Sequence, residues 1–91
     1  MTQVLPVEYH LEFYTVSFGN DPFFSAQTSS PLMGISKGDQ FDWRGFRNFP
    51  LTVAAGSVLK VAEIRHIIWE IEGDHISHKL MIAFEVEPLD A

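Results

Sequence analysis

Hydrophobic and polar residues alternate most regularly in the last third of the chain. In residues 75–87, HISHKLMIAFEVE, the alternation has the two-residue period of a β-strand. One face of this predicted strand carries Ile76, His78, Leu80, Ile82, Phe84 and Val86. Residues 57–72 are rich in β-branched side chains, and a helix there would be apolar all round, so a strand is favoured. A tight turn at residues 72–75 joins the two strands in a long C-terminal β-hairpin.

The N-terminal part of the chain predicts another strand, over residues 4–18. Its apolar positions change phase after Phe13, which a β-bulge would produce. Residues 19–34 contain many Ser, Gly and Pro residues and are expected to form a loop, in which Asp21 and Pro22 can start one helical turn. At least one of the neighbouring residues Phe23 and Phe24 is expected to fold back onto the core.

Two short strands are predicted within residues 32–43, around a turn at Gly38. Residues 44–57 then form a long connection. The chain is therefore expected to be one all-β domain, residues 1–91, with about five mostly antiparallel strands. We expect a small barrel or a half-open sandwich, because both hide strand edges.

The segment 63–80 contains three of the four histidines of the chain. With a two-residue turn at 73–74, Trp69 lies opposite His78, and a bulge near residues 67–68 keeps the inner face apolar. His66 and His78 then share a face but lie about 13 Å apart, too far to bind one metal ion. The sequence therefore predicts no metal site. The two histidines are either structural and hydrogen-bonded, or one of them lines a pocket beside Trp69.

A second group of candidate residues lies in the segment 41–49, FDWRGFRNF, where aromatic residues alternate with arginines. Trp and Arg are enriched at binding hot spots, although the phenylalanines of this segment can equally pack inside the fold. The candidate residues for binding a ligand or a partner are Trp43, Arg44, Arg47, His66, Trp69 and His78.

Composition and charge narrow the function classes. The chain is a small acidic protein with a net charge of −6, which disfavours nucleic-acid binding. It has no cysteine, so disulfides, thiolate zinc sites and cysteine nucleophiles are excluded. No phosphate-binding glycine loop and no Ser-His-Asp pattern occurs, so we assign no catalytic residue and no cofactor. No signal peptide or membrane span is evident, and a cytoplasmic location is expected.

Two segments, ISKGDQF (35–41) and LKVAEIRHIIWEIEGDHISHKLMIAFEVEP (59–88), resemble small uncharacterised bacterial proteins, including those encoded on integron mobile gene cassettes. The resemblance implies a compact, cytoplasmic, β-rich bacterial domain that is often oligomeric and has no assigned activity. It transfers no functional residue to this chain.

Three functions fit these observations. The first is a non-catalytic binding or interaction module that acts as a homo-oligomer, most simply a dimer, because a short β-rich chain with long strands needs its edges covered. The second is an acidic inhibitor or immunity-type protein that docks on a basic partner. Its acidic residues would be Glu70, Glu72, Glu85 and Glu87. The third is a small-molecule pocket or minor enzyme near Trp69 and His78, with Trp43 and His66 beside it.

Overall fold

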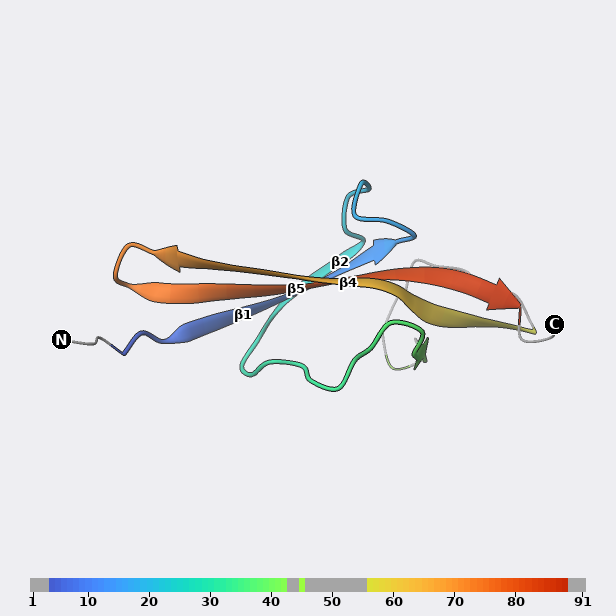
Figure 1. Cartoon of the computed structure of the whole chain (residues 1–91), viewed down its shortest axis with the longest axis horizontal. Coiled ribbons are helices and arrows are strands. Elements are labelled where there is room, and N and C mark those ends of the chain that lie inside the picture. Colours follow the sequence, from blue (N-terminus) through green and yellow to red (C-terminus); the bar gives the residue numbers. More distant parts are fainter. Residues whose placement is uncertain (1–3, 43–44, 46–55, 89–91) are drawn as a thin grey trace.

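The computed structural model describes residues 4–42, 45 and 56–88. Its strands are β1 (Val7–Thr15), β2 (Phe24–Thr28), β3 (Gln40–Phe41), β4 (Ser57–Ile71) and β5 (His75–Pro88). They form one sheet in the order β2-β1-β5-β4-β3, which curls into a half-barrel. Figure 1 shows the long, twisted strands of this sheet. The predicted all-β class and the long C-terminal hairpin are confirmed. None of the described segments forms a helix that is long and apolar enough to cross a membrane.

The sheet is mixed. β1 runs parallel to β5, from the pair Val7↔Ile76 to the pair Thr15↔Phe84. The pairings β1–β2, β3–β4 and β4–β5 are antiparallel. The expectation of mostly antiparallel strands therefore holds, but the strand at the centre of the sheet, β5, has a parallel neighbour that lies far away in sequence.

The hairpin β4–β5 has a different register from the predicted one. Its turn contains three residues, 72–74, so that Ile71 pairs with His75 and Trp69 with Ser77. Gly73 adopts a φ of 71°, and the Asp74 N–H donates to the Ile71 carbonyl at 2.7 Å. A shift of one residue moves every side chain to the other face. The predicted pairing of Trp69 with His78 is therefore wrong, and the two residues lie on opposite faces.

The bulges also differ from the predicted ones. β4 has its register shift between Val61 and Glu63, not near residues 67–68. β1 has no bulge, because its pairing with both neighbours is continuous. The phase change after Phe13 arises because β1 is an interior strand with both faces covered. Phe13 belongs to the main core, whereas Tyr14 packs with Met81 on the opposite face.

The segment between β1 and β4 agrees only in part with the prediction. Residues 24–28, expected in a loop, form β2, and the expected helical turn at Asp21 and Pro22 is absent. Phe23 and Phe24 both pack against the main core, as expected for at least one of them. Of the two short strands predicted around Gly38, only β3 is present, although Gly38 does adopt a φ of 93°. The long connection falls mainly outside the described residues.

The main core lies on one face of the sheet, opposite the smaller cluster that contains Tyr14. Its main cluster consists of Leu11, Phe13, Leu59, Val61, Leu80, Ile82 and Phe84. The ring of Phe13 stacks on Phe24 at 4.9 Å and meets the edge of Phe84 at 5.1 Å between centroids. Aromatic pairs in these geometries add to the stabilisation from burial alone. These rings anchor β1, β2 and β5 to one another.

The molecule is elongated rather than compact. Its extents are 57 × 24 × 24 Å and its radius of gyration is 15.6 Å, against about 12 Å for a compact domain of this length. The hairpin β4–β5 runs along most of this length (Figure 1). The buried apolar residues of β4, Leu59 and Val61, lie near its start. By contrast, all of residues 65–71 are exposed, so the half of β4 near the hairpin turn has little cover.

Candidate functional site

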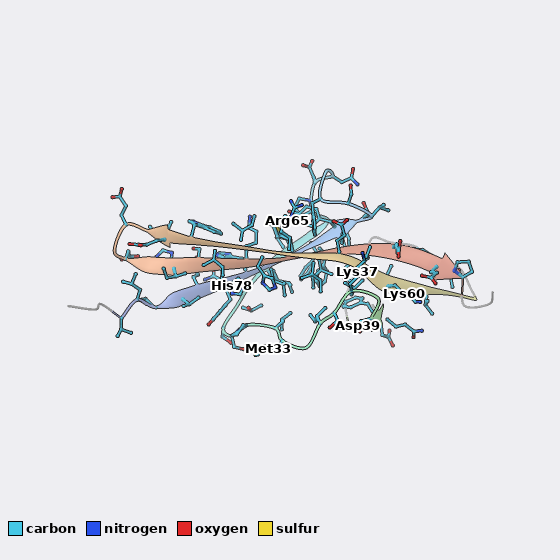
Figure 2. All side chains as sticks on the ribbon, in the orientation of Figure 1. Met33, Lys37, Asp39, Lys60, Arg65 and His78 are labelled. Atoms are coloured by element: carbon cyan, nitrogen blue, oxygen red, sulfur yellow. The ribbon has the colours of Figure 1, made fainter. Side chains whose placement is uncertain are left out.

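The two faces of the sheet carry different chemistry. We call the face with His78, Leu80 and Ile82 the groove face, because the segment 29–39 crosses it on the way from β2 to β3. The other side, with Ser77, Lys79 and Met81, is the outer face. Figure 2 shows His78 on the side of the sheet toward Met33, and Arg65 on the opposite side.

His66 and His78 form a direct pair on the groove face. The His66 Nδ1 and the His78 Nε2 lie 2.9 Å apart, and the ring centroids are separated by 5.1 Å with a tilt of 39°. His66 pairs with Leu80 and Ile68 with His78, so the histidines are diagonal neighbours on adjacent strands. The predicted separation of about 13 Å is wrong, because β4 is regular between these residues and its bulge lies earlier. The two histidines are therefore close enough to share a metal ion.

The hydrogen bond between the two rings constrains their protons. A neutral imidazole has one N–H donor and one acceptor nitrogen, so one facing nitrogen carries a proton and the other offers a lone pair. The remaining nitrogens, His66 Nε2 and His78 Nδ1, point away from the shared bond. The ring of Tyr9 lies 5.9 Å from that of His78. No nucleophile is hydrogen-bonded to either histidine among the contacts of the described residues, so the pair lacks the arrangement of a catalytic triad.

A groove of about 380 Å³ lies beside the histidine pair. Its floor comes from β1, β4 and β5, and its wall from the segment 31–35. The lining residues are Tyr9, Pro31, Leu32, Met33, Gly34, Ile35, Ile64, His66, His78 and Leu80. The groove is mainly apolar, and the two imidazoles contribute polar groups to its lining. This composition is typical of sites for small organic ligands.

Trp69 lies on the outer face, among residues that sequence reasoning did not select. Its indole stacks on His10 with 6.4 Å between centroids and an angle of 18°. The Lys79 Nζ lies 5.9 Å from the Trp69 ring and 3.5 Å from a carboxylate oxygen of Glu12. The polar positions of the first strand were visible in the sequence. Their proximity to Trp69 depends on the parallel pairing of β1 with β5, which no local pattern reveals.

The other two histidines, His10 and His75, contact carboxylate groups on the outer face. The His10 Nε2 lies 2.9 Å from a Glu8 oxygen, and the second Glu8 oxygen lies 3.9 Å from the His75 Nε2. The His75 Nδ1 contacts the Asp74 carboxylate at 2.7 Å. No group of three or more potential metal ligands occurs among the residues that the structure describes. We interpret this network as one that ties the start of β1 to the hairpin turn.

One ionisable group on the outer face has a perturbed pKa. Tyr14 is only 5 % exposed, and its hydroxyl donates to Glu12 at 2.5 Å. Burial, followed by the hydrogen bond and the negative charge of Glu12, raises the pKa of Tyr14 to about 12. Tyr14 is therefore a neutral packing residue at physiological pH.

The remaining candidate residues do not gather with the histidine pair. Trp43, Arg44 and Arg47 lie outside the described residues. The four acidic residues that were expected to form one docking face are divided between the two ends of the hairpin. Glu70 pairs with Ile76 near the turn, whereas Glu85 pairs with Lys60. Nine positions along β5 correspond to about 30 Å, so a single acidic docking face on this hairpin is wrong.

Among the described residues, the edge of β4 that faces away from β5 is paired only near its start. β3 pairs only with Leu59 and Lys60, and Val61 exchanges hydrogen bonds with Gly38 and Asp39. From Glu63 to Ile71, no strand pairs with this edge within the described ranges 4–42 and 56–88. Four large apolar residues of this stretch are exposed: Ile67 at 40 %, Ile68 at 64 %, Trp69 at 37 % and Ile71 at 41 %.

Comparisons with protein-family models, curated proteins and solved structures find no match for this chain. The resemblance to integron-cassette proteins therefore stays a prediction.

Proposed function

We propose that this protein is a non-catalytic interaction module that works as a homodimer, with two copies joined along the β4 edge. The observation that supports the proposal is the β4 edge from Glu63 to Ile71, which no strand of the described residues pairs with and which carries exposed apolar side chains. Natural proteins protect such edges with charges, prolines, bulges or very short strands, because an open edge pairs with other strands. This stretch of β4 contains no proline, and its bulge lies before it.

A second copy is the simplest partner for this edge. Two β4 edges related by a two-fold axis perpendicular to the sheet pair in antiparallel fashion, and each copy satisfies the backbone groups of the other. Such an axis places the same face of both copies on the same side of the joined sheet. Side chains alternate between the two faces along a strand, so two residues that face each other must both have even numbers or both have odd numbers. A register centred on Ile67 pairs the whole stretch from Glu63 to Ile71 with its copy, and a register centred on Ile68 pairs residues 65–71.

We favour the register centred on Ile68, because it combines apolar contact with charge complementarity. It places Ile68 against the same residue of the other copy and Ile67 against the partner's Trp69. It also places His66 across from the partner's Glu70, which can accept a hydrogen bond from the imidazole. The register centred on Ile67 instead leaves Ile64 across from the partner's Glu70.

Cysteine cross-linking tests this interface directly, because the natural chain contains no cysteine. A residue on the two-fold axis faces its own copy, and directly opposed Cβ atoms of adjacent strands lie about 4.5–5.5 Å apart, near the range of a disulfide. We expect Ile68→Cys to give a covalent dimer under mild oxidation with diamide, and Ile67→Cys to react more slowly. Val86→Cys, on the same hairpin but 47 % exposed at its other end, is the matched control.

Native mass spectrometry of the unmodified protein completes the test. A dimer at micromolar concentration, together with selective cross-linking at residue 68, supports the proposal. A protein that is monomeric at that concentration, and whose residue-68 cysteine reacts no faster than the control, would refute it. Faster reaction at residue 67 would keep the dimer and correct its register.

A second candidate function is the binding of a small apolar ligand in the groove beside His66 and His78. Its support is the volume and apolar lining of the groove. Anilinonaphthalene sulfonate is a suitable probe, since its rings match the apolar wall and its sulfonate can meet an imidazole N–H. We expect Leu32→Asp, at the groove wall, to abolish the fluorescence increase, and Val16→Asp, at an exposed site after β1, to preserve it. Equal fluorescence in both variants would remove this candidate.

The acidic inhibitor hypothesis has less support, because its four glutamates are divided between the two ends of the hairpin. A cytoplasmic location, a bacterial origin and the absence of a nucleic-acid partner stay predictions from the sequence.

A further inference from the structure

We propose that His66 and His78 form a two-histidine chelating site for a divalent transition metal ion such as Zn²⁺, Ni²⁺ or Cu²⁺. Imidazole nitrogen is a preferred ligand of these three metals. The site needs neither a second copy of the chain nor an organic ligand to form.

The separation of the two nitrogens is the first argument. In tetrahedral zinc sites with Zn–N distances of about 2.0–2.1 Å, the ligand nitrogens lie about 3.3 Å apart. The His66 Nδ1 and the His78 Nε2 are 2.9 Å apart, so the rings need to separate by only about 0.4 Å. They must also rotate, so that both lone pairs converge on one point outside the line that joins the nitrogens.

The surroundings allow this rotation. His66 is exposed and His78 is half-buried, with the open groove beside both rings. The neutral pair already contains one facing nitrogen with a free lone pair. The donor ring exposes its own lone pair by moving its proton to its other nitrogen, so a pair of neutral imidazoles can bind the metal without losing a proton.

The strands hold the two rings at the correct spacing before the metal arrives. His66 and His78 are diagonal neighbours in a continuous antiparallel pairing that extends from Glu63↔Ala83 to Ile71↔His75. Preorganised ligands lose little conformational freedom on binding. Two protein ligands leave the remaining coordination positions of the metal open to water, or to a donor atom of a molecule in the groove.

The chain provides its own control residues. His10 and His75 lie on the outer face and are engaged by Glu8 and Asp74. Substitution of these two histidines removes the same number of imidazoles from the protein without touching the groove face. A comparison of the two pairs therefore separates a specific site from general metal binding by surface histidines.

The experiment is a calorimetric titration of the untagged protein with Zn²⁺, Ni²⁺ and Cu²⁺ at pH 7.5. We expect about one metal ion per chain, at least tenfold weaker binding in His66→Asn and in His78→Gln, and no change in the variant His10→Asn/His75→Gln. Asn and Gln retain a polar group near the replaced nitrogen, and His66→Ala and His78→Ala provide a second pair of variants if either fold is disturbed. Electron paramagnetic resonance of bound Cu²⁺ is expected to show coupling to two imidazole nitrogens, reduced to one in each single variant.

Three results would overturn the proposal. The first is the absence of binding by all three metals at submillimolar concentration. The second is unchanged binding in both groove-face variants, with circular dichroism showing intact folds. The third is the loss of binding in the outer-face variant, which would place the metal at Glu8 instead.

Discussion

The dimer interface predicts a large effect from one exposed residue, Ile68. Replacement by lysine removes an apolar side chain that is 64 % exposed in the single chain, and it places two ammonium groups against each other at the two-fold axis. Full burial of an isoleucine side chain stabilises by about 1.5–3 kcal/mol. Because Ile68 is still about two-thirds exposed in the single chain, its burial at the interface can contribute roughly 1–2 kcal/mol per copy to the stability of the dimer.

Both copies carry the substitution, so the dimer loses about 2–4 kcal/mol before charge repulsion is added. At about 1.4 kcal/mol per tenfold change, the dissociation constant rises about 30- to 1,000-fold. Stability of the single chain is expected to change by less than about 0.5 kcal/mol, because the residue is exposed there.

Sedimentation velocity over a dilution series measures this constant. Val86→Lys is the control, since Val86 is also an exposed apolar residue of the hairpin, at 47 %, but lies at the other end. We expect its dissociation constant to match that of the natural protein. Equal dissociation constants for Ile68→Lys and the natural protein would refute the assignment of the β4 edge, and equal weakening by both variants would point to a nonspecific effect of charge.

Three further predictions concern the stability of the fold. Phe13→Ala removes a ring that is 2 % exposed at the centre of the aromatic core, and is expected to lower the free energy of unfolding by about 3–5 kcal/mol in urea; a loss below about 1 kcal/mol would contradict the assigned core. The pKa of Tyr14 is 10.0 in the unfolded chain and about 12 in the fold. The neutral Tyr14 side chain therefore makes its full contribution to the stability of the fold below pH 10, and this contribution is lost as the pH rises to about 12. In a pH titration followed by phenolate absorbance, we therefore expect a late-titrating tyrosine in the natural protein and in Tyr9→Phe, but not in Tyr14→Phe. A late titration that persists in Tyr14→Phe would contradict this assignment. Gly73→Ala forces a side chain into a φ of 71° and should destabilise the hairpin by about 1–2 kcal/mol, whereas an unchanged melting temperature would indicate a different turn.

The hairpin was predictable because its signal is local. The alternation in residues 75–87 and the glycine at position 73 depend only on neighbouring residues. The register was not predictable in the same way, because a turn of two residues and a turn of three are both compatible with Glu72, Gly73 and Asp74. The difference of one residue in the length of the turn decides whether His78 or Ser77 lies opposite Trp69.

The candidate site was also predictable only in part. His66 and His78 were selected correctly as the histidines of one face, but an incorrectly placed bulge separated them. The actual shift lies between Val61 and Glu63. It brings Val61 opposite Phe84 and keeps both in the core, and it leaves the Glu63 side chain exposed on the outer face. The groove wall at residues 31–35 had no signal in the sequence, because it depends on how an irregular segment crosses the sheet.

The parallel pairing of β1 with β5 has a consequence for how the protein is made. The paired residues are separated by about 70 positions, so β1 leaves the ribosome long before its partner. Until β5 has emerged, Leu11 and Phe13 lack the strand that buries them. Contacts that are so distant in sequence also slow folding. Stalled nascent chains of increasing length are therefore expected to become resistant to protease only after residue 84 has left the exit tunnel, and resistance in shorter chains would show that β1 has another early partner.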